Sequence, residues 1–188
     1  MIKKLEDFDR YVAAAGFRDV VIQDINSFFG TVRRKLGDVH FQFFDARLIA
    51  GWEHLYFAAL NTLNAFKNKT NISRSVAVET LLYASAQRQI EKAVDLLGIK
   101  SESSRIVVLI VAETKQKVAS TLKAVSKLVM GERDDSVLEL TDEKVKDIRE
   151  LFDISDLELE AKLEKEGLER EALIDLVIEH MALLTTQR

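Results

Sequence analysis

The sequence predicts the α+β class: a small mixed β-sheet surrounded by several α-helices, in a single domain spanning residues 1–188. Two observations carry this prediction. Residues 105–111 (RIVVLIV) are mostly β-branched, without polar alternation, and such a run is typical of a central strand covered on both faces. Most other apolar residues recur at helical spacing, between glycines and polar capping residues. The order of these segments favours a small sheet with helices around it.

The N-terminal part contains two predicted helices and two predicted strands. Apolar residues at helical spacing predict a short helix over residues 8–15, which Gly16 ends, and a longer helix over residues 24–36. Residues 20–22 (VVI) predict a short strand. Residues 39–44 alternate well enough for a strand with one face in the core.

Residues 45–98 are predicted to form a hairpin of helices, around which the rest of the chain is organised. An apolar stripe marks the first helix, and the polar residues 67–71 interrupt it with a turn. Ser73 or Ser75 then caps the second helix, because a short side-chain oxygen accepts a hydrogen bond from a free N–H of the first turn. After a polar patch at residues 87–89 the apolar stripe resumes to the end of the segment.

The C-terminal half returns to helical spacing after the central strand. Thr141 is followed by two acidic residues, which favours a helix start because carboxylates suit the positive end of the helix dipole. The predicted elements are a helix over residues 114–130, a turn at 131–135, a short strand at 136–140, a helix from 141, a helix from 155 that ends at Gly167, and a last helix over 171–184.

The composition, with 47% hydrophobic and 31% charged residues, is that of an ordinary soluble globular protein. The sequence has no run of about 18 uncharged apolar residues, which a membrane span would need, and its N-terminus lacks the apolar segment of a secretory signal. The absence of cysteine excludes disulfides, thiolate zinc sites and thiol nucleophiles, and it fits a cytoplasmic location. No cofactor is expected.

The net charge of −4 hides an uneven distribution. Residues 31–100 carry ten basic and six acidic side chains, whereas residues 101–188 carry 13 basic and 20 acidic ones. A protein that wraps a long nucleic-acid backbone is usually basic overall, which this chain is not. The middle segment leaves room for a contact with a few phosphates, although ordinary charge scatter on a solvated surface is the favoured interpretation.

The sequence offers no recognisable catalytic set. His40, His54 and His180 are far apart, and residues 52–54 (WEH) lack the second histidine that a zinc-protease helix carries one turn later. Glycine-rich phosphate loops and nucleophile elbows are also absent from the sequence. One enzyme alternative stays open, in which dispersed carboxylates act with His54. It requires a ligand-sized pocket in which polar groups converge at that histidine.

Polar residues near the helix junctions form a better candidate site. His54, residues 71–74 (NISR) and residues 85–89 (SAQRQ) are expected to meet at one end of the hairpin. Arginine offers a planar donor fork for phosphate, and amides and imidazole can reach bases or stack on them. Such a set suits a short single-stranded RNA end. The competing structural interpretations are a His54 satisfied at its helix start and an Arg88 paired with a nearby glutamate, Glu79 or Glu91.

Five segments, in order, resemble the kinase-binding subunit of the KEOPS tRNA-modification complex, of the archaeal type. They are residues 50–55 (AGWEHL), 71–74 (NISR), 85–90 (SAQRQI), 134–138 (DDSVL) and 179–184 (EHMALL). Ala86 stands where this family usually has glycine. The resemblance covers most of the chain from about residue 40 onward.

The resemblance implies a non-catalytic subunit. Family members dock on the small atypical kinase of the complex and support its activity, and archaeal members bind the 3′ CCA end of tRNA. The complex, through a separate catalytic threonylcarbamoyltransferase subunit, places a threonylcarbamoyl group on an adenosine of tRNA. By analogy the expected RNA-binding residues are His54, Arg74, Gln87 and Arg88, and the expected kinase-binding residues are Val94, Leu96 and Leu97.

Two further points bear on these expectations. Leu96 and Leu97 are consecutive, so both cannot face the same side of a helix, and one of them is expected to be exposed for a partner. The alternative for all the apolar residues of this segment is burial in the core. The alternative function is a helical protein–protein adaptor without an RNA-binding role, which predicts no salt-dependent affinity for tRNA.

Overall fold

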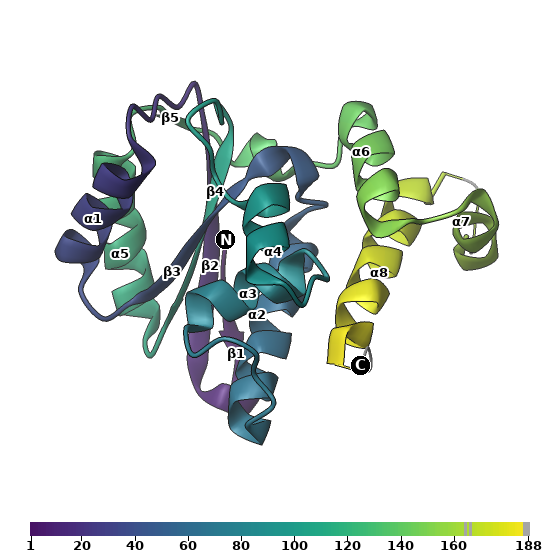
Figure 1. Cartoon of the computed structure of the whole chain (residues 1–188), viewed down its shortest axis with the longest axis horizontal. Coiled ribbons are helices and arrows are strands. Elements are labelled where there is room, and N and C mark those ends of the chain that lie inside the picture. The colour runs from purple at the N-terminus through teal and green to yellow at the C-terminus, as the bar shows by residue number, and fades with distance from the viewer. Residues whose placement is uncertain (164, 166, 186–188) are drawn as a thin grey trace. The chain divides into compact units, whose positions relative to one another are not determined.

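The computed structural model describes residues 1–163, 165 and 167–185, and it divides the chain into two compact units (Figure 1). The first unit comprises residues 1–46 and 98–137. The second comprises residues 47–97 and 138–188. Each unit is therefore assembled from two separate stretches of the chain.

The first unit is built on a β-sheet with β2 and β4 at its centre. The strands are β1 (Ile2–Leu5), β2 (Arg10–Arg18), β3 (His40–Asp45), β4 (Ile106–Ala112) and β5 (Glu132–Arg133). Their order is β1-β2-β4-β3, and the short β5 also pairs with β2. The α+β class is confirmed. The sheet was expected to be mixed, but every strand pairing in the described part of the chain is antiparallel.

The predicted central strand is β4, which begins one residue later than expected. All seven of its residues are buried, and it pairs with β2 on one side and with β3 on the other. A strand that is paired on both sides and buried on both faces has no position for a polar side chain, which explains its continuous apolar run. The strand predicted over residues 39–44 is confirmed as β3.

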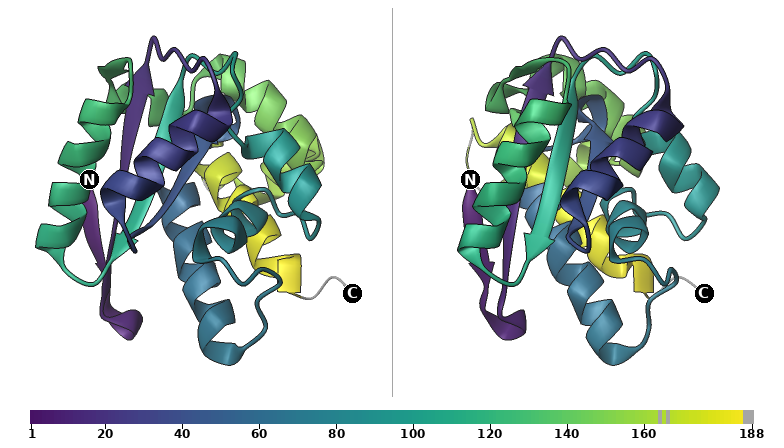
Figure 2. Two further views of the ribbon diagram at one scale, coloured as in Figure 1. Left: turned by 60° about the vertical axis from the view of Figure 1, so that its left-hand side comes forward. Right: turned by 90° about the vertical axis from the view of Figure 1, so that its left-hand side faces the viewer.

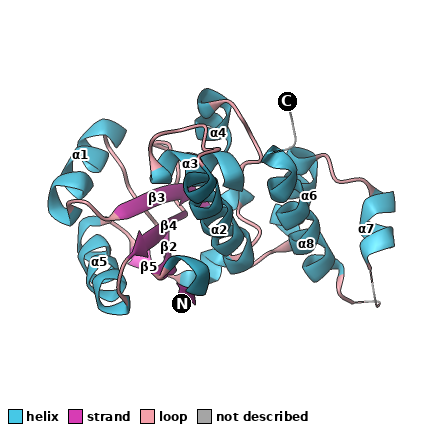
Figure 3. Cartoon of the chain, turned by 90° about the horizontal axis from the view of Figure 1, so that it is seen from below, coloured by secondary structure: helices cyan, strands magenta, loops and turns pink. Residues whose placement is uncertain are grey.

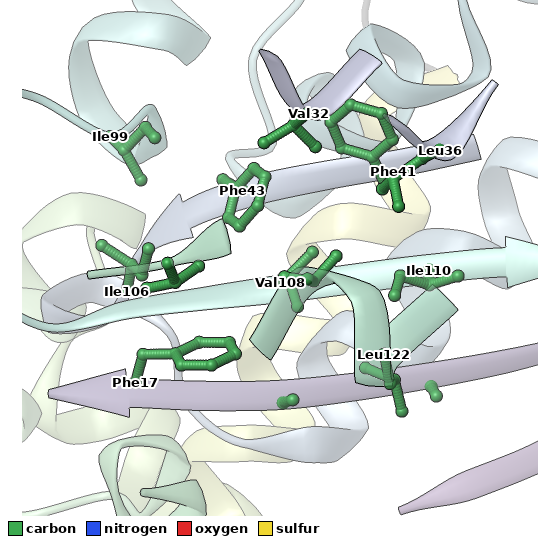
Figure 4. Packing of buried hydrophobic residues seen from close by; sticks show 14 of the residues in the cluster. Phe17, Val32, Leu36, Phe41, Phe43, Ile99, Ile106, Val108, Ile110 and Leu122 are labelled. Carbon is green, nitrogen blue, oxygen red and sulfur yellow. The ribbon is translucent and has the colours of Figure 1, made fainter. Parts of the chain in front are cut away.

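Helices α1 (Ile25–Leu36) and α5 (Lys115–Leu128) lie over one face of this sheet (Figure 2). The predictions of helices over residues 24–36 and 114–130 are thus confirmed. Asp24 caps α1 by accepting a hydrogen bond from the N–H of Ser27 (2.6 Å). Side chains from the two helices and three strands meet in an apolar core (Figure 4). It includes Phe17, Val32, Leu36, Phe41, Phe43, Ile106, Val108, Ile110, Val118, Leu122 and Val125.

Strand β2 replaces the helix predicted over residues 8–15, and that prediction is wrong. The apolar residues there have helical spacing and include alanines, which favour helices. They pair instead with β1 on one side and with β4 on the other, so tertiary pairing overrides the local preference. Gly16 does not end a helix. It lies inside the strand, where a Cβ atom would overlap the carbonyl oxygen of Asp134 and the side chain of Val137.

Two predicted short strands do not form. At residues 20–22 consecutive backbone N–H groups donate to two different segments, so no ladder results. The strand predicted at residues 136–140 is replaced by a 3-10 helix (Asp135–Leu138). Asp134 explains this change, because its carboxylate accepts a hydrogen bond from the N–H of Ser136 (3.0 Å) and favours a turn over an extended chain.

The second unit is helical in its described part (Figure 3). Its helices are α2 (Trp52–Asn68), α3 (Val76–Ala84), α4 (Ile90–Leu97), α6 (Asp142–Phe152), α7 (Asp156–Lys162) and α8 (Glu169–Ala182). Helices α2 and α3 form the predicted hairpin, and Ser75 caps α3 by accepting a hydrogen bond from the N–H of Val78. The second helix of the hairpin ends at Ala84, however, and its expected continuation to Gly98 is the separate helix α4, because a turn follows Ala84. Helix α8 packs against α2, α6 and α7, which joins the two stretches of chain in this unit.

The helix starts predicted in the C-terminal half are also confirmed. Helix α6 follows Thr141, and α7 follows Ser155. Ser155 forms a capping box with Glu158: its hydroxyl accepts a hydrogen bond from the Glu158 N–H, and the Glu158 carboxylate accepts one from the Ser155 N–H. Helix α7 ends at Lys162, before the predicted stop at Gly167.

Candidate ligand cleft and partner surface

A polar cleft of about 330 Å³ lies in the second unit, where the turn between α3 and α4 meets residues of α6 and α8. Three separate parts of the chain contribute to it. The lining residues are Ser85, Ala86, Gln87, Arg88, Gln89, Lys92, Leu151, Phe152, Asp153 and His180. Two cations, Arg88 and Lys92, line it against the single carboxylate of Asp153. Its charge therefore favours an anionic ligand.

The turn that leads into this cleft is a Schellman motif at the end of α3. The N–H of Gln87 donates to the carbonyl of Leu82, and the N–H of Ala86 donates to that of Tyr83, each at 3.0 Å. Ala86 has a φ of 49°, the left-handed conformation in which glycine is preferred. The backbone would therefore accept glycine at this position at a lower conformational cost than alanine.

His54 lies behind this turn and is fully buried, at 0% exposed. Its Nδ1 accepts a hydrogen bond from the N–H of Ala50 (3.1 Å), so the proton of the neutral ring is on Nε2, which donates to the carbonyl of Ala84 (2.7 Å). Burial lowers the pKa of His54 to about 4. The bond to Ala84 opposes this change, and the positive charge of Lys144 adds to it.

These bonds match the structural interpretation of His54, a histidine satisfied at its helix start. The ring does not line the cleft, and it has no exposed surface through which to touch RNA or a substrate in this structure. The enzyme alternative requires a pocket in which polar groups converge at His54, and a ring with no exposed surface does not fit that requirement.

Gln87 and Arg88 are brought together in the cleft. Arg88 is exposed, and its Nη1 donates to the carbonyl of Leu184, 3.3 Å away. The alternative partner, Glu79, directs its carboxylate to other groups. The Glu79 carboxylate is buried and accepts hydrogen bonds from backbone N–H groups of another loop.

Arg74 lies at the opposite end of the hairpin. Helix α3 separates it from the turn at residues 85–89, and nine helical residues span about 13 Å. Glu79 holds the loop that carries Arg74, accepting hydrogen bonds from the N–H groups of Ile72 (3.0 Å) and Ser73 (2.6 Å). The expected meeting of all the polar segments at one end of the hairpin is therefore not observed.

The expected kinase-binding residues on α4 differ in exposure. Val94 is 45% exposed, Leu96 is half-buried and Leu97 is 0% exposed. The two consecutive leucines thus differ as their adjacency predicts, and it is Leu97 that has no surface to offer a partner in this structure. Ile90, which the site prediction did not include, is 44% exposed and lies one turn before Val94, so the two form a short apolar stripe.

Sequence reasoning missed the part of the cleft wall that comes from α6 and α8. Phe152 contacts the rings of His54 and His180 edge to face, with centroid distances of 5.8 and 6.3 Å. Periodicity within one segment carries no information on such distant neighbours. One signal was available for His180, because it belongs to the last of the five segments that resemble the family.

The groups gathered in the cleft are a guanidinium, an ammonium and amides, which are donors that recognise phosphate and RNA. Among the described residues, histidine, cysteine, aspartate and glutamate side chains nowhere gather in threes in a way that could hold a metal ion. The helices searched in that same part of the chain are too short or too polar to cross a membrane.

A model of the family described as kinase binding protein CGI-121 matches residues 17–185. The chain belongs to this family. It is also similar to the regulatory protein Cgi121 of Methanocaldococcus jannaschii, with 34% identity over 136 residues that cover 72% of this chain and 83% of that protein. The matched range contains the α2–α3 hairpin, the cleft and α4. The resemblance inferred from the five segments is thereby confirmed.

Proposed function

We propose that this CGI-121 family member is a non-catalytic regulatory subunit of an archaeal KEOPS complex. In this role it binds the small atypical kinase of the complex and recruits tRNA through the 3′ CCA end. It thus supports threonylcarbamoyladenosine modification in the cytoplasm, and it acts on the catalytic threonylcarbamoyltransferase subunit only indirectly. The observation that carries the proposal is the cationic cleft at the turn between α3 and α4, in a chain of a kinase-binding family.

The chemistry of the cleft suits the end of a single-stranded RNA. Arg88 offers a planar fork that binds a phosphate with two parallel hydrogen bonds, and Lys92 adds a second cation. The amides of Gln87 and Gln89 can donate to and accept from base edges. Helix α4 begins directly after this turn, and its positive end favours a phosphate there.

The four expected RNA-binding residues take different roles in this proposal. Gln87 and Arg88 contact the RNA end directly. Arg74 is about 13 Å further along the hairpin and contacts the strand upstream of its end. His54, which is buried behind the turn, contributes without touching the RNA.

The kinase contact is proposed on the exposed side of α4. Ile90 and Val94 form its apolar stripe, and the half-buried Leu96 extends it toward the helix end. Two neighbouring apolar side chains on the exposed face of a helix, beside the charged Glu91, Lys92 and Asp95, suit a helix-mediated protein contact. Leu97 supports this surface from beneath, as part of the buried side of α4.

The RNA arm of the proposal is tested by the affinity for tRNA with and without its 3′ CCA, at several salt concentrations. Removal of CCA is expected to abolish binding. Arg88→Ala is expected to weaken binding about tenfold and to lower the slope of log affinity against log salt by about 0.7, because one phosphate contact is lost. Arg74→Ala should cause a smaller loss. Lys115→Ala, an exposed cation of α5, is the matched control.

Equal binding of the two RNAs, or an Arg88→Ala variant that binds like the wild type, would contradict the assigned RNA site. A chain that binds the kinase but neither RNA would be a protein–protein adaptor. The exposed apolar stripe of α4 is the observation that favours this second function.

The kinase arm is tested by binding of the purified kinase to Val94→Glu. The affinity is expected to fall about 30-fold, the effect of removing a central apolar contact of an interface. Leu157→Glu is the control, because Leu157 is 75% exposed on α7, away from α4. A substitution at the buried Leu97 would disturb folding and would not test the contact. Undiminished kinase binding by Val94→Glu would remove α4 from the interface.

A further inference from the structure

The hydrogen bonds of His54 define one protonation state of its ring. The N–H of Ala50 can only donate, so Nδ1 must offer a lone pair. The carbonyl of Ala84 can only accept, so Nε2 must carry the proton. The neutral ring protonated on Nε2 is therefore the form that satisfies both partners. Protonation of Nδ1 would set one N–H against another.

The two partners of His54 belong to different segments. Ala50 precedes the start of α2, and Ala84 is the last residue of α3. The Schellman turn follows Ala84 directly and leads to Arg88. The ring therefore ties the beginning of one helix to the end of the next, at the point where the chain enters the cleft.

A third contact of the ring reaches another wall of the cleft. Its edge packs on Phe152 at the end of α6, and Phe152 in turn packs on His180 of α8. Phe152 and His180 both line the cleft, and Arg88 lines it from the turn. One buried imidazole thus adjoins two of the segments that shape the cleft, while it contributes no surface of its own.

We infer that His54 is a positioning residue, whose Nε2–H bond to the Ala84 carbonyl fixes the turn that carries Arg88 in the orientation that binds the RNA end. This inference rests on the proposed function, because the ligand is the one proposed above. It adds a role for a residue that cannot itself touch that ligand. Of the two hydrogen bonds, the one to Ala84 is the bond that matters for binding.

The bonds can be separated by two substitutions of similar size. The amide nitrogen of His54→Gln replaces Nε2 and can donate to Ala84, whereas the amide oxygen of His54→Asn replaces Nδ1 and can accept from Ala50. His54→Asn is expected to lose about tenfold in tRNA affinity, the effect of one buried hydrogen bond. His54→Gln should stay within about threefold of the wild type, since it keeps the Ala84 bond. His40→Asn, in the first unit, is the control.

A readout without RNA accompanies the affinities. In ¹H–¹⁵N spectra the amide signals of residues 86–89 should move in His54→Asn and stay near their wild-type positions in His54→Gln. If both variants lose affinity alike, or if both keep the wild-type signals and affinity, His54 does not position the turn. If Arg88→Ala and the wild type bind tRNA equally, the proposed function fails, while the amide signals still decide whether His54 positions the turn.

Discussion

The α2–α3 hairpin has a turn of the same type at each of its two ends, but different side chains fix the two turns. Both helices end in Schellman motifs whose left-handed residue is not glycine: Lys69 (φ 57°) after α2 and Ala86 (φ 49°) after α3. At one end the carboxylate of Glu79 binds the loop that follows. At the other end the ring of His54 binds the last carbonyl of the helix.

The two ends differ because the buried side chains of Glu79 and His54 form different kinds of hydrogen bond with the backbone. A carboxylate can only accept, so Glu79 is matched to two adjacent N–H groups of the loop. A neutral imidazole accepts at one nitrogen and donates at the other, so His54 joins an N–H of one segment to a carbonyl of another. The loop at the Glu79 end is therefore fixed relative to α3, the helix that it precedes, whereas the turn at the His54 end is fixed relative to the start of α2.

The largest expected difference between the two ends is in how their contribution to stability depends on pH. The folded-state pKa of His54 is about 4, below its ordinary value of 6.5, so between these values the unfolded chain binds more protons. The stability that neutral His54 contributes is fully present above pH 6.5 and is lost as the pH falls toward 4. The difference between the two pKa values corresponds to about 3 kcal/mol.

Denaturant unfolding of the wild type and of His54→Gln at pH 7 and pH 4 measures this pH-dependent contribution of His54 to stability. The stability difference between the two proteins should change by about 3 kcal/mol in favour of the variant on acidification, because only the wild type carries the titrating ring. A pH-independent difference would mean that the buried ring is not held in its neutral form.

A smaller effect is expected at the other end of the hairpin. Glu79→Gln keeps the size of the side chain but replaces one accepting oxygen with an NH₂ group that opposes the backbone donors. The free energy of unfolding should fall by about 2 kcal/mol, since a charge-assisted buried acceptor is lost. Glu91→Gln, on the exposed face of α4, is the matched control and should change stability by less than about 0.5 kcal/mol.

The tRNA affinity of Glu79→Gln tests whether the two ends of the hairpin act independently. The variant should keep the contribution of Arg88 to affinity, because the hydrogen bonds that it loses are those to Ile72 and Ser73, before the start of α3, and the turn lies after its end. A loss of tRNA affinity as large as that expected for His54→Asn would show that the two ends of the hairpin are coupled.

Local pattern alone was sufficient for most of the fold. The fully apolar run of β4 and the helical stripes of α1, α2, α5 and α8 each signal their element within a few neighbouring residues. It failed at β2, where Tyr11 and the alanines that follow read as a helix and only the pairing with β1 and β4 decides the outcome. Strand pairing is a long-range property, so one segment cannot reveal it.

The candidate site was predictable only in part, because local pattern shows which residues share a segment and not which distant segments meet. Gln87 and Arg88 stand together in one polar turn of the sequence, and both line the cleft. Phe152 and His180 join that site from helices distant in sequence, which no local pattern indicates. The exposure of His54 was equally out of reach, because it depends on Ala50, Ala84 and Phe152 packing around the ring.

The smallest expected effect concerns the feature that the two ends share. Alanine in the left-handed conformation costs about 1 kcal/mol relative to glycine, because its Cβ approaches the following carbonyl. Ala86→Gly should therefore raise the free energy of unfolding by about 1 kcal/mol, and Lys69→Gly should act in the same direction at the other end.

Thermal unfolding of the two glycine variants measures these gains, and Ala77→Gly inside α3 is the control with the opposite sign, costing about 1 kcal/mol. A destabilised Ala86→Gly would mean that the turn is not held at positive φ. Binding adds a second comparison. Ala86→Gly frees the backbone directly before Gln87 and Arg88, so its tRNA affinity should stay unchanged only if the His54–Ala84 bond, and not the strain at Ala86, orients the turn.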